Sequence, residues 1–223
     1  MFVTASSLVV ARGDLTIVQK VESGTSVSQM TIKLKGDKAR IEATPQVTTI
    51  MDTKSGEMLT LMNDEKKFLR ISGEKAKAFA EMVSKYGATA AEKPKLTLTG
   101  KKETIGGYET EEYVSEKASF KASYWIALNY PDGAVILKQL QTMVPKDWNE
   151  AAKGVPDYRD FPGLPLRTQI KMGGKEITTT ITSIKQDGLS EAEFIPPKDF
   201  EEMKVPKIET MLGDKPAAPS PTP

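Results

Sequence analysis

Cysteine and histidine are both absent from the 223-residue chain. Without cysteine there is no disulfide, no thiolate metal site and no thiol nucleophile. Without histidine the chain lacks the commonest general base and the commonest metal ligand. Catalysis would depend on carboxylates, but neighbours such as Glu111 and Glu112 on a strand point to opposite faces and cannot serve one cleft. We therefore expect a non-enzymatic protein that holds neither a metal nor a cofactor.

No excess of either charge is present, since 31 Lys and Arg stand against 30 Asp and Glu. The two signs alternate along the chain, whereas a nucleic-acid-binding protein would carry a basic stripe. No apolar run approaches the roughly 18 residues that cross a bilayer. These features exclude nucleic acid as a partner and predict no transmembrane segment. A chain of 24.4 kDa suits one domain, which we expect to be a monomer.

The two ends of the chain differ from the rest in composition. Residues 1–13 are apolar and rich in small side chains up to Arg12, so they are either the start or signal remnant of an exported protein, or an ordinary first strand. Residues 206–223 are rich in proline and alanine and are predicted to be disordered. Residues 14–205 then form the single predicted domain.

Period-two alternation of apolar and polar residues dominates the chain and predicts antiparallel strands. About six strands are expected up to residue 71, followed by an amphipathic helix over 72–87. About three strands follow up to residue 128, then a second helix over 131–144. A hairpin over 165–186 turns at Gly173 and Gly174, with an apolar and a polar face. Beyond it, residues 191–194 are predicted to be a strand and residues 198–203 a helical turn.

No strand–helix–strand unit recurs, so a parallel doubly wound sheet is disfavoured. The predicted fold class is α+β, with one strongly curved antiparallel sheet and helices on its concave face. Such a sheet cannot fill its own hollow, so either the helices fill it with side chains or a ligand does.

Two segments resemble a known superfamily. They are "IGGYETEEY" with "YWIA", within 104–128, and "GLPLRTQIKMGGKEITTTITSIKQDGLSEAEFIPPKDF", over 163–200. Both are similar to strands and turns of the LolA/LolB/LppX-like superfamily of periplasmic lipoprotein and lipid carriers, and most similar to a bacterial family of unknown function within it. The resemblance covers 14–205 in element order. It implies a half-open antiparallel barrel with helices over its concave side, an apolar cavity for acyl chains, and a periplasmic or otherwise exported location.

The resemblance and the apolar alternation together indicate which side chains would line such a cavity. The predicted ligand-binding residues are Ile32, Leu34, Leu59, Leu61, Phe79, Met82, Val83, Leu96, Leu98, Tyr124, Ile126, Ile136, Leu140, Met143, Ile170, Ile177 and Ile181. No charged headgroup anchor can be assigned from the sequence. Arg70 and Arg167 are candidates because they lie on strands next to apolar neighbours, but the alternation places them on the convex face.

Two functions remain open from the sequence. The first is an exported carrier of a lipid or acyl chain. The second is a structural or protein-interaction module of the cell envelope with a fully packed core, which recruits a partner through the convex face or an edge strand. Hydrophobic periodicity cannot distinguish a filled interior from an empty one.

Overall fold

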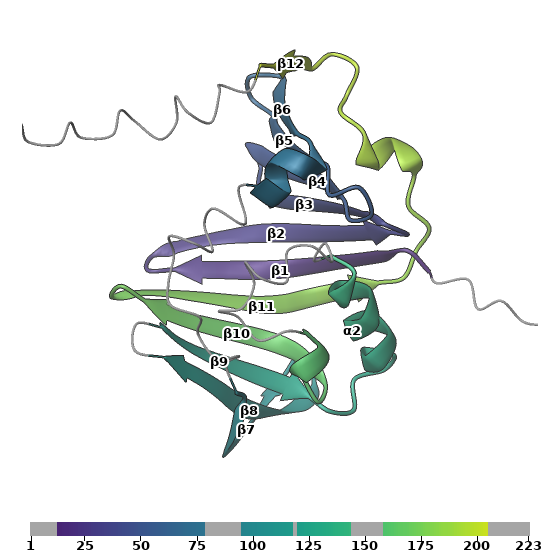
Figure 1. Ribbon diagram of the computed structural model, residues 1–223. Helices are drawn as coiled ribbons and strands as arrows, with labels where there is room; N and C mark the ends of the chain where they lie inside the picture. Colours follow the sequence, from purple (N-terminus) through teal and green to yellow (C-terminus); the bar gives the residue numbers. More distant parts are fainter. Residues whose placement is uncertain (1–12, 79–94, 118–119, 144–157, 205–223) are drawn as a thin grey trace, which may run out of the picture.

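A computed structural model describes residues 13–78, 95–117, 120–143 and 158–204, and in them a single twelve-stranded sheet (Figure 1). The strands are β1 (Leu15–Ser23), β2 (Ser26–Lys35), β3 (Lys38–Thr44), β4 (Val47–Asp52), β5 (Met58–Met62), β6 (Lys67–Ile71), β7 (Thr97–Ile105), β8 (Tyr108–Lys117), β9 (Phe120–Ala127), β10 (Leu164–Met172), β11 (Lys175–Lys185) and β12 (Glu201–Met203). Their order across the sheet is β12-β6-β5-β4-β3-β2-β1-β11-β10-β9-β8-β7. The sheet is open, with edges at β12 and β7.

The strand pairing confirms the six-strand meander, the three following strands and the closing hairpin. Every pair of neighbours is antiparallel except β12 and β6, which are parallel. The hairpin turns at Gly173 and Gly174, whose φ angles are +57° and +75°. Two successive positive φ angles define the turn type that matches the right-handed twist of a hairpin, and glycine reaches them without strain. The hairpin then brings β11 beside β1, which joins the two halves of the sheet.

The predicted structure of the last ordered segment was wrong in two places. Residues Glu191–Phe194 form a short 3-10 helix, η3, and not a strand. Ser190 caps the start of this helix with a capping box. Its side chain accepts a hydrogen bond from a backbone N–H of the helix, and the Glu193 side chain accepts one from the Ser190 backbone N–H. Residues Glu201–Met203 are strand β12 and not a helical turn, because the Glu201 N–H donates to the Lys66 carbonyl and continues along β6.

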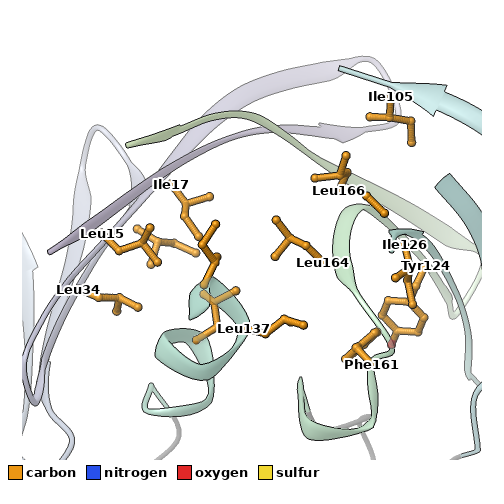
Figure 2. Packing of buried hydrophobic residues seen from close by; sticks show 14 of the residues in the cluster. Leu15, Ile17, Leu34, Ile105, Tyr124, Ile126, Leu137, Phe161, Leu164 and Leu166 are labelled. Carbon is orange, nitrogen blue, oxygen red and sulfur yellow. The ribbon is translucent and has the colours of Figure 1, made fainter. Parts of the chain in front are cut away.

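One helix, α2 (Gly133–Gln141), packs against the sheet and confirms the second predicted helix. It buries Ile136, Leu137 and Leu140, which share one helical face. These side chains join Leu15 and Ile17 of β1 in the main core, and Figure 2 shows α2 on the inner side of the curved strands. Burying each of these aliphatic side chains contributes about 1.5–3 kcal/mol. We call this side of the sheet the inner face and the opposite side the outer face.

Most of the first predicted helix lies outside the described residues. Residues 73–78 are helical and bury Ala76, but 79–94 are not described. The predicted terminal segments lie mostly outside as well, since the description covers 13–204 at its widest. A cover of two helices over the concave face is therefore not confirmed.

A second hydrophobic cluster lies on the outer face of β4, β5 and β6. It consists of Ile50, Leu59, Leu61 and Phe68, and Phe194 of η3 covers it. Residues 189–203, which we call the C-terminal strap, supply Leu189 and Phe200 at its margin. Figure 1 shows the strap leaving the end of β11 and crossing to β12 beside β6. The strap thus closes the outer face of the meander.

Ion pairs fasten the strap to basic residues of the sheet. Glu193 lies 2.6 Å from the Lys33 ammonium, and Glu191 lies 2.7 Å from Lys38. The Arg40 guanidinium also donates to the Glu193 carbonyl at 2.9 Å. The hydrogen bond from Lys33 lowers the pKa of Glu193, and that from Lys38 lowers the pKa of Glu191, each below the ordinary 4.5. Both carboxylates favour the docked strap while they are charged.

This arrangement predicts acid release of the strap. A carboxylate with a lowered folded-state pKa contributes stability above its unfolded pKa and loses that contribution as the pH falls. Urea midpoints should therefore decrease from about pH 6 to about pH 3, and Glu193→Gln should flatten that decrease. The matched control is Glu65→Gln, on an exposed turn residue outside the strap contacts. An unchanged slope in Glu193→Gln would contradict the assignment.

Candidate hydrophobic ligand site

In five successive cross-strand rows of the inner face, the charged side chains are Glu111 and Lys102, which pair with each other at the β8–β7 end of the third row. The strand registers, read from Leu15 to Ser23 along β1, define these rows. They are Leu15, Leu34, Ala39, Met51, Met58 and Ile71; Ile184, Ile17, Ile32, Ile41, Thr49, Thr60 and Leu69; Ile181, Gln19 and Met30, continued beyond the bulge in β10 by Ile126, Glu111 and Lys102; Leu98, Tyr113, Tyr124, Thr168, Thr179, Val21 and Ser28; and Ser115, Ala122, Ile170, Ile177, Ser23 and Ser26. Charged residues make up 27% of the chain as a whole, so the scarcity of charged side chains in these rows is specific to the inner face.

The outer face carries the charges that the inner face lacks. Arg167 lies opposite Trp125, stacks its guanidinium 5.6 Å from the ring centroid and binds Glu103 at 2.8 Å. Arg70 lies opposite Leu59 and binds Glu57 at 2.6 Å. The prediction that both arginines lie on the convex face is confirmed. Neither can reach a ligand on the inner face.

Part of the inner face is open to solvent. The end near Leu15 is sealed by α2, but Ile177 is 42% exposed and Leu98 is 50% exposed. Ile170 lies on the neighbouring strand in the row of Ile177, and Ile181 lies two rows away on the strand of Ile177; both are half-buried at the margin of the core. Ile177, Ile170 and Ile181 form a small apolar surface, which favours an apolar contact. The open part is the site at which a hydrophobic molecule could lie.

The structure brings most of the predicted site residues to this face and to α2. Ile32, Leu34, Tyr124, Ile126, Ile136 and Leu140 are buried members of the main core, and Leu96, Met143, Ile170 and Ile181 pack at its margin. Leu98 and Ile177 are the exposed members. Phe79, Met82 and Val83 lie outside the described residues. Binding of a ligand by any of them stays a prediction.

The prediction that Leu59 and Leu61 share this face is wrong. Leu59 pairs with Ile50 and Leu61 pairs with Thr48, whereas the inner register runs through Met58 and Thr60. Both leucines therefore belong to the outer cluster beneath the strap. The physical reason is that β5 carries apolar side chains on both faces, so the alternation alone does not show which face Leu59 and Leu61 occupy.

A pocket of about 280 Å³ adjoins the main core between α2 and the segment that precedes β10. Leu137 and Leu164 belong both to the pocket wall and to the core. Tyr158, in the short 3-10 helix η2 (Tyr158–Asp160), and Phe161 form the opposite wall. The volume lies just below the range of about 300–1,000 Å³ typical of ligand pockets.

Aromatic contacts fix this wall. The Phe161 ring meets Tyr124 edge-on at 5.0 Å between centroids and lies 5.8 Å from Tyr158. Burial raises the pKa of Tyr124 to about 12, and burial also raises the pKa of Tyr158. Both phenols therefore stay neutral at physiological pH. Sequence analysis missed Tyr158 and Phe161 because they lie in a proline-stiffened loop without periodicity.

A second pocket, of about 240 Å³, lies on the outer face and is polar. Lys101, Lys121 and Lys171 surround Glu112, whose side chain is 7% exposed. Desolvation would raise the pKa of Glu112, but the hydrogen bonds from Thr99 and Lys101 bring its pKa below 4.5. Lys121 and Lys171 are paired with Glu116 and Glu176. Each lysine of this pocket is therefore already paired with a carboxylate, and the pocket offers no free charge to a ligand.

In the described part of the chain, no helix combines the length and the apolar character that crossing a bilayer requires. Within the same residues, no three acidic side chains come together as metal ligands would.

Comparison with known families gives one decisive match. A family model described as "Domain of unknown function (DUF4412)" matches residues 12–200. The chain belongs to the DUF4412 family. A search of curated proteins gives no significant match.

Solved structures similar to this DUF4412 chain share little of its sequence. They include PNGF-II (15% identity, TM-score 0.42, 90% of this chain and 32% of that one) and MucB in complex with MucA(peri) (12%, 0.38, 86% and 57%). A MucA/MucB complex from Pseudomonas aeruginosa is also among them. The lipoprotein LppX from Mycobacterium tuberculosis matches at 11% identity and TM-score 0.38, with coverage of 78% and 88%. The chain spans about a third of PNGF-II and somewhat more than half of MucB.

Proposed function

We propose that this DUF4412 protein is an exported, non-enzymatic protein that binds the hydrophobic part of a lipid on its inner face. The observation that supports it is the predominantly apolar inner face, with Ile177 and Leu98 exposed on it, while the outer face carries ion pairs such as that of Arg167 with Glu103. Exposed hydrophobic side chains on an otherwise apolar surface favour contact with an apolar molecule. The LolA-like resemblance of the sequence agrees with this function and with a periplasmic location.

Binding would be driven by burial of methylene groups, each contributing about 0.8 kcal/mol. The pocket beside α2 would receive one end of the chain, because it is continuous with the core through Leu137 and Leu164. The half-buried Met30, in the row next to Ile17, offers a flexible thioether that adapts to chains of different shape.

Native mass spectrometry of the protein purified from a bacterial host tests the proposal directly. We expect a bound mass that organic extraction removes and that corresponds to a lipid. An apo mass that stays unchanged after incubation with lipid vesicles would contradict the proposal. It would favour the alternative function, an envelope interaction module with a packed core.

A matched pair of variants locates the site. Ile177→Asp places a charge on the exposed part of the inner face, whereas Val27→Asp places one on the outer face, where Val27 pairs with Glu22 and is 63% exposed. Both positions are exposed, so both variants should fold. We expect Ile177→Asp to lose the bound lipid and Val27→Asp to retain it. A lipid chain that covers the new carboxylate would desolvate its charge, and this is costly only where the chain binds. Equal retention would move the site elsewhere.

A further inference from the structure

The last cross-strand row of the inner face, at the turn of the β10–β11 hairpin, has a lysine at both ends. It runs from Lys117 on β8 through Phe120 and Met172 to Lys175 on β11. Residues alternate between the two faces along a strand, so Lys175 shares its face with Ile177, two positions later. We call this row the terminal row. It places cationic residues beside the exposed hydrophobic part of the inner face.

Lys175 is exposed, and it makes no ion pair within the described residues. Its neighbours Lys171 and Glu176 pair with each other at 2.8 Å on the outer face, so Glu176 is already engaged. The nearest acidic position of the inner face in the described register is Glu111, three rows away, and Lys102 pairs with it at 3.2 Å. The ammonium group of Lys175 is therefore available to an anion.

The β8 to β11 part of the neighbouring row, from Ser115 to Ile177, is open to solvent at one end. Ile177 is 42% exposed at the β11 end, whereas Ser115 is 1% exposed at the β8 end. The Ser115 hydroxyl is buried as well, and it makes no hydrogen bond to any described residue. An amphiphile therefore reaches this row from β11, where Lys175 precedes Ile177 by two positions.

We infer that the inner face binds an amphiphile with an anionic headgroup, whose charge lies at Lys175 while its chain runs along Ile177 toward Ile181. This inference rests on the proposed function and adds the class of the ligand and the direction in which it lies. Six positions of β11 separate Lys175 from Ile181, a span of roughly 20 Å. One lipid chain spans about 15 Å, half of a bilayer's hydrocarbon core, so this stretch is long enough for it.

Charge complementarity favours an anionic headgroup over the other kinds. A cationic headgroup would lie beside a like charge, and a neutral one would gain nothing from the lysine. Because Lys175 is exposed, the headgroup keeps its contact with water and avoids the desolvation cost of a buried charge. The contribution of an exposed ion pair is modest and is screened by salt, so the preference for an anion should decrease as the ionic strength rises.

Displacement of the neutral dye Nile red by two lysophospholipids tests the inference. Myristoyl lysophosphatidylglycerol is anionic and myristoyl lysophosphatidylcholine is zwitterionic, and both are used below their micellar concentrations at low salt. We expect the anionic lipid to bind about two- to fivefold more tightly, the range of an exposed ion pair. Lys175→Gln should remove most of this preference by weakening the anionic lipid alone, and Lys175→Glu should abolish it.

Lys185→Gln is the matched control, because Lys185 is an exposed lysine of the same strand that pairs with Thr16 on the outer face. It should change neither affinity. The inference is overturned, while lipid binding stands, if the zwitterionic lipid binds as tightly as the anionic one or if Lys175→Gln leaves the preference unchanged. The same holds if glycerol 3-phosphate, which has no chain, displaces the anionic lipid at equal concentration, because the site would then bind a free anion. If neither lipid nor the dye binds, the proposed function itself fails.

Discussion

Replacing Phe194 with alanine is expected to destabilise the protein by about 3–5 kcal/mol, the usual cost of removing a buried phenylalanine. Phe194 is 4% exposed and caps the outer cluster of Ile50, Leu59, Leu61 and Phe68. Leu189 and Phe200 of the strap pack against the margin of the same cluster. The variant would lose the ring and would also expose apolar surface of three strands. Urea unfolding, followed by circular dichroism, measures the effect.

Ile195→Ala is the control for Phe194→Ala, because the neighbouring residue is 54% exposed and its truncation should cost at most about 0.5 kcal/mol. Limited proteolysis separates global from local loss. If the strap docks independently, Phe194→Ala should be cleaved between residue 186 and β12 while the remaining sheet keeps its midpoint. Similar midpoints and cleavage rates in both variants would show that the strap does not stabilise the outer face.

The strap also explains where sequence reasoning succeeded and where it failed. The alternation of Ile32 and Leu34 with Lys33 assigns β2 correctly, because only one face of that strand is apolar. Strand β5 is different, since Met58 and Leu59 are adjacent and both apolar. Its outer face is covered by Phe194, more than 130 positions later in the chain, so no local pattern reveals that Leu59 points outward. A residue distant in the sequence can thus bury one face of a strand and make the local alternation of apolar residues misleading.

The candidate site was predictable only in part, for a related reason. The apolar members, such as Ile170 and Tyr124, lie on strands whose period two is visible in the sequence. Ser115 has no such signal, because a serine on an amphipathic strand is typical of a solvated position. Its burial on the inner face becomes apparent only when the register pairs it with Ala122 and its exposure is known. Sequence pattern defines a face, but packing decides which polar atoms on that face are left unpaired.

Gly163→Ala is expected to be destabilising by about 3 kcal/mol, at the upper end of the cost of overpacking. A Cβ atom at Gly163 would lie 2.4 Å from the Ala127 carbonyl oxygen and 2.9 Å from the Leu128 Cα. Both contacts are backbone, so no side-chain rotation relieves them. The end of β9 would have to separate from β10, where Leu164 pairs with Ala127 and is fully buried. The variant should therefore also disturb the pocket beside α2.

Gly188→Ala provides a control of opposite sign. A Cβ atom there has no neighbour within 4 Å, so the substitution restricts only the unfolded chain and should stabilise the protein by about 0.4–1 kcal/mol. Thermal unfolding of the two variants, beside the native protein, measures both effects. A midpoint of Gly163→Ala equal to that of the native protein would mean that β9 and β10 separate at little cost. The wall formed by Phe161 would then be adaptable, and the pocket could admit chains wider than its resting volume allows.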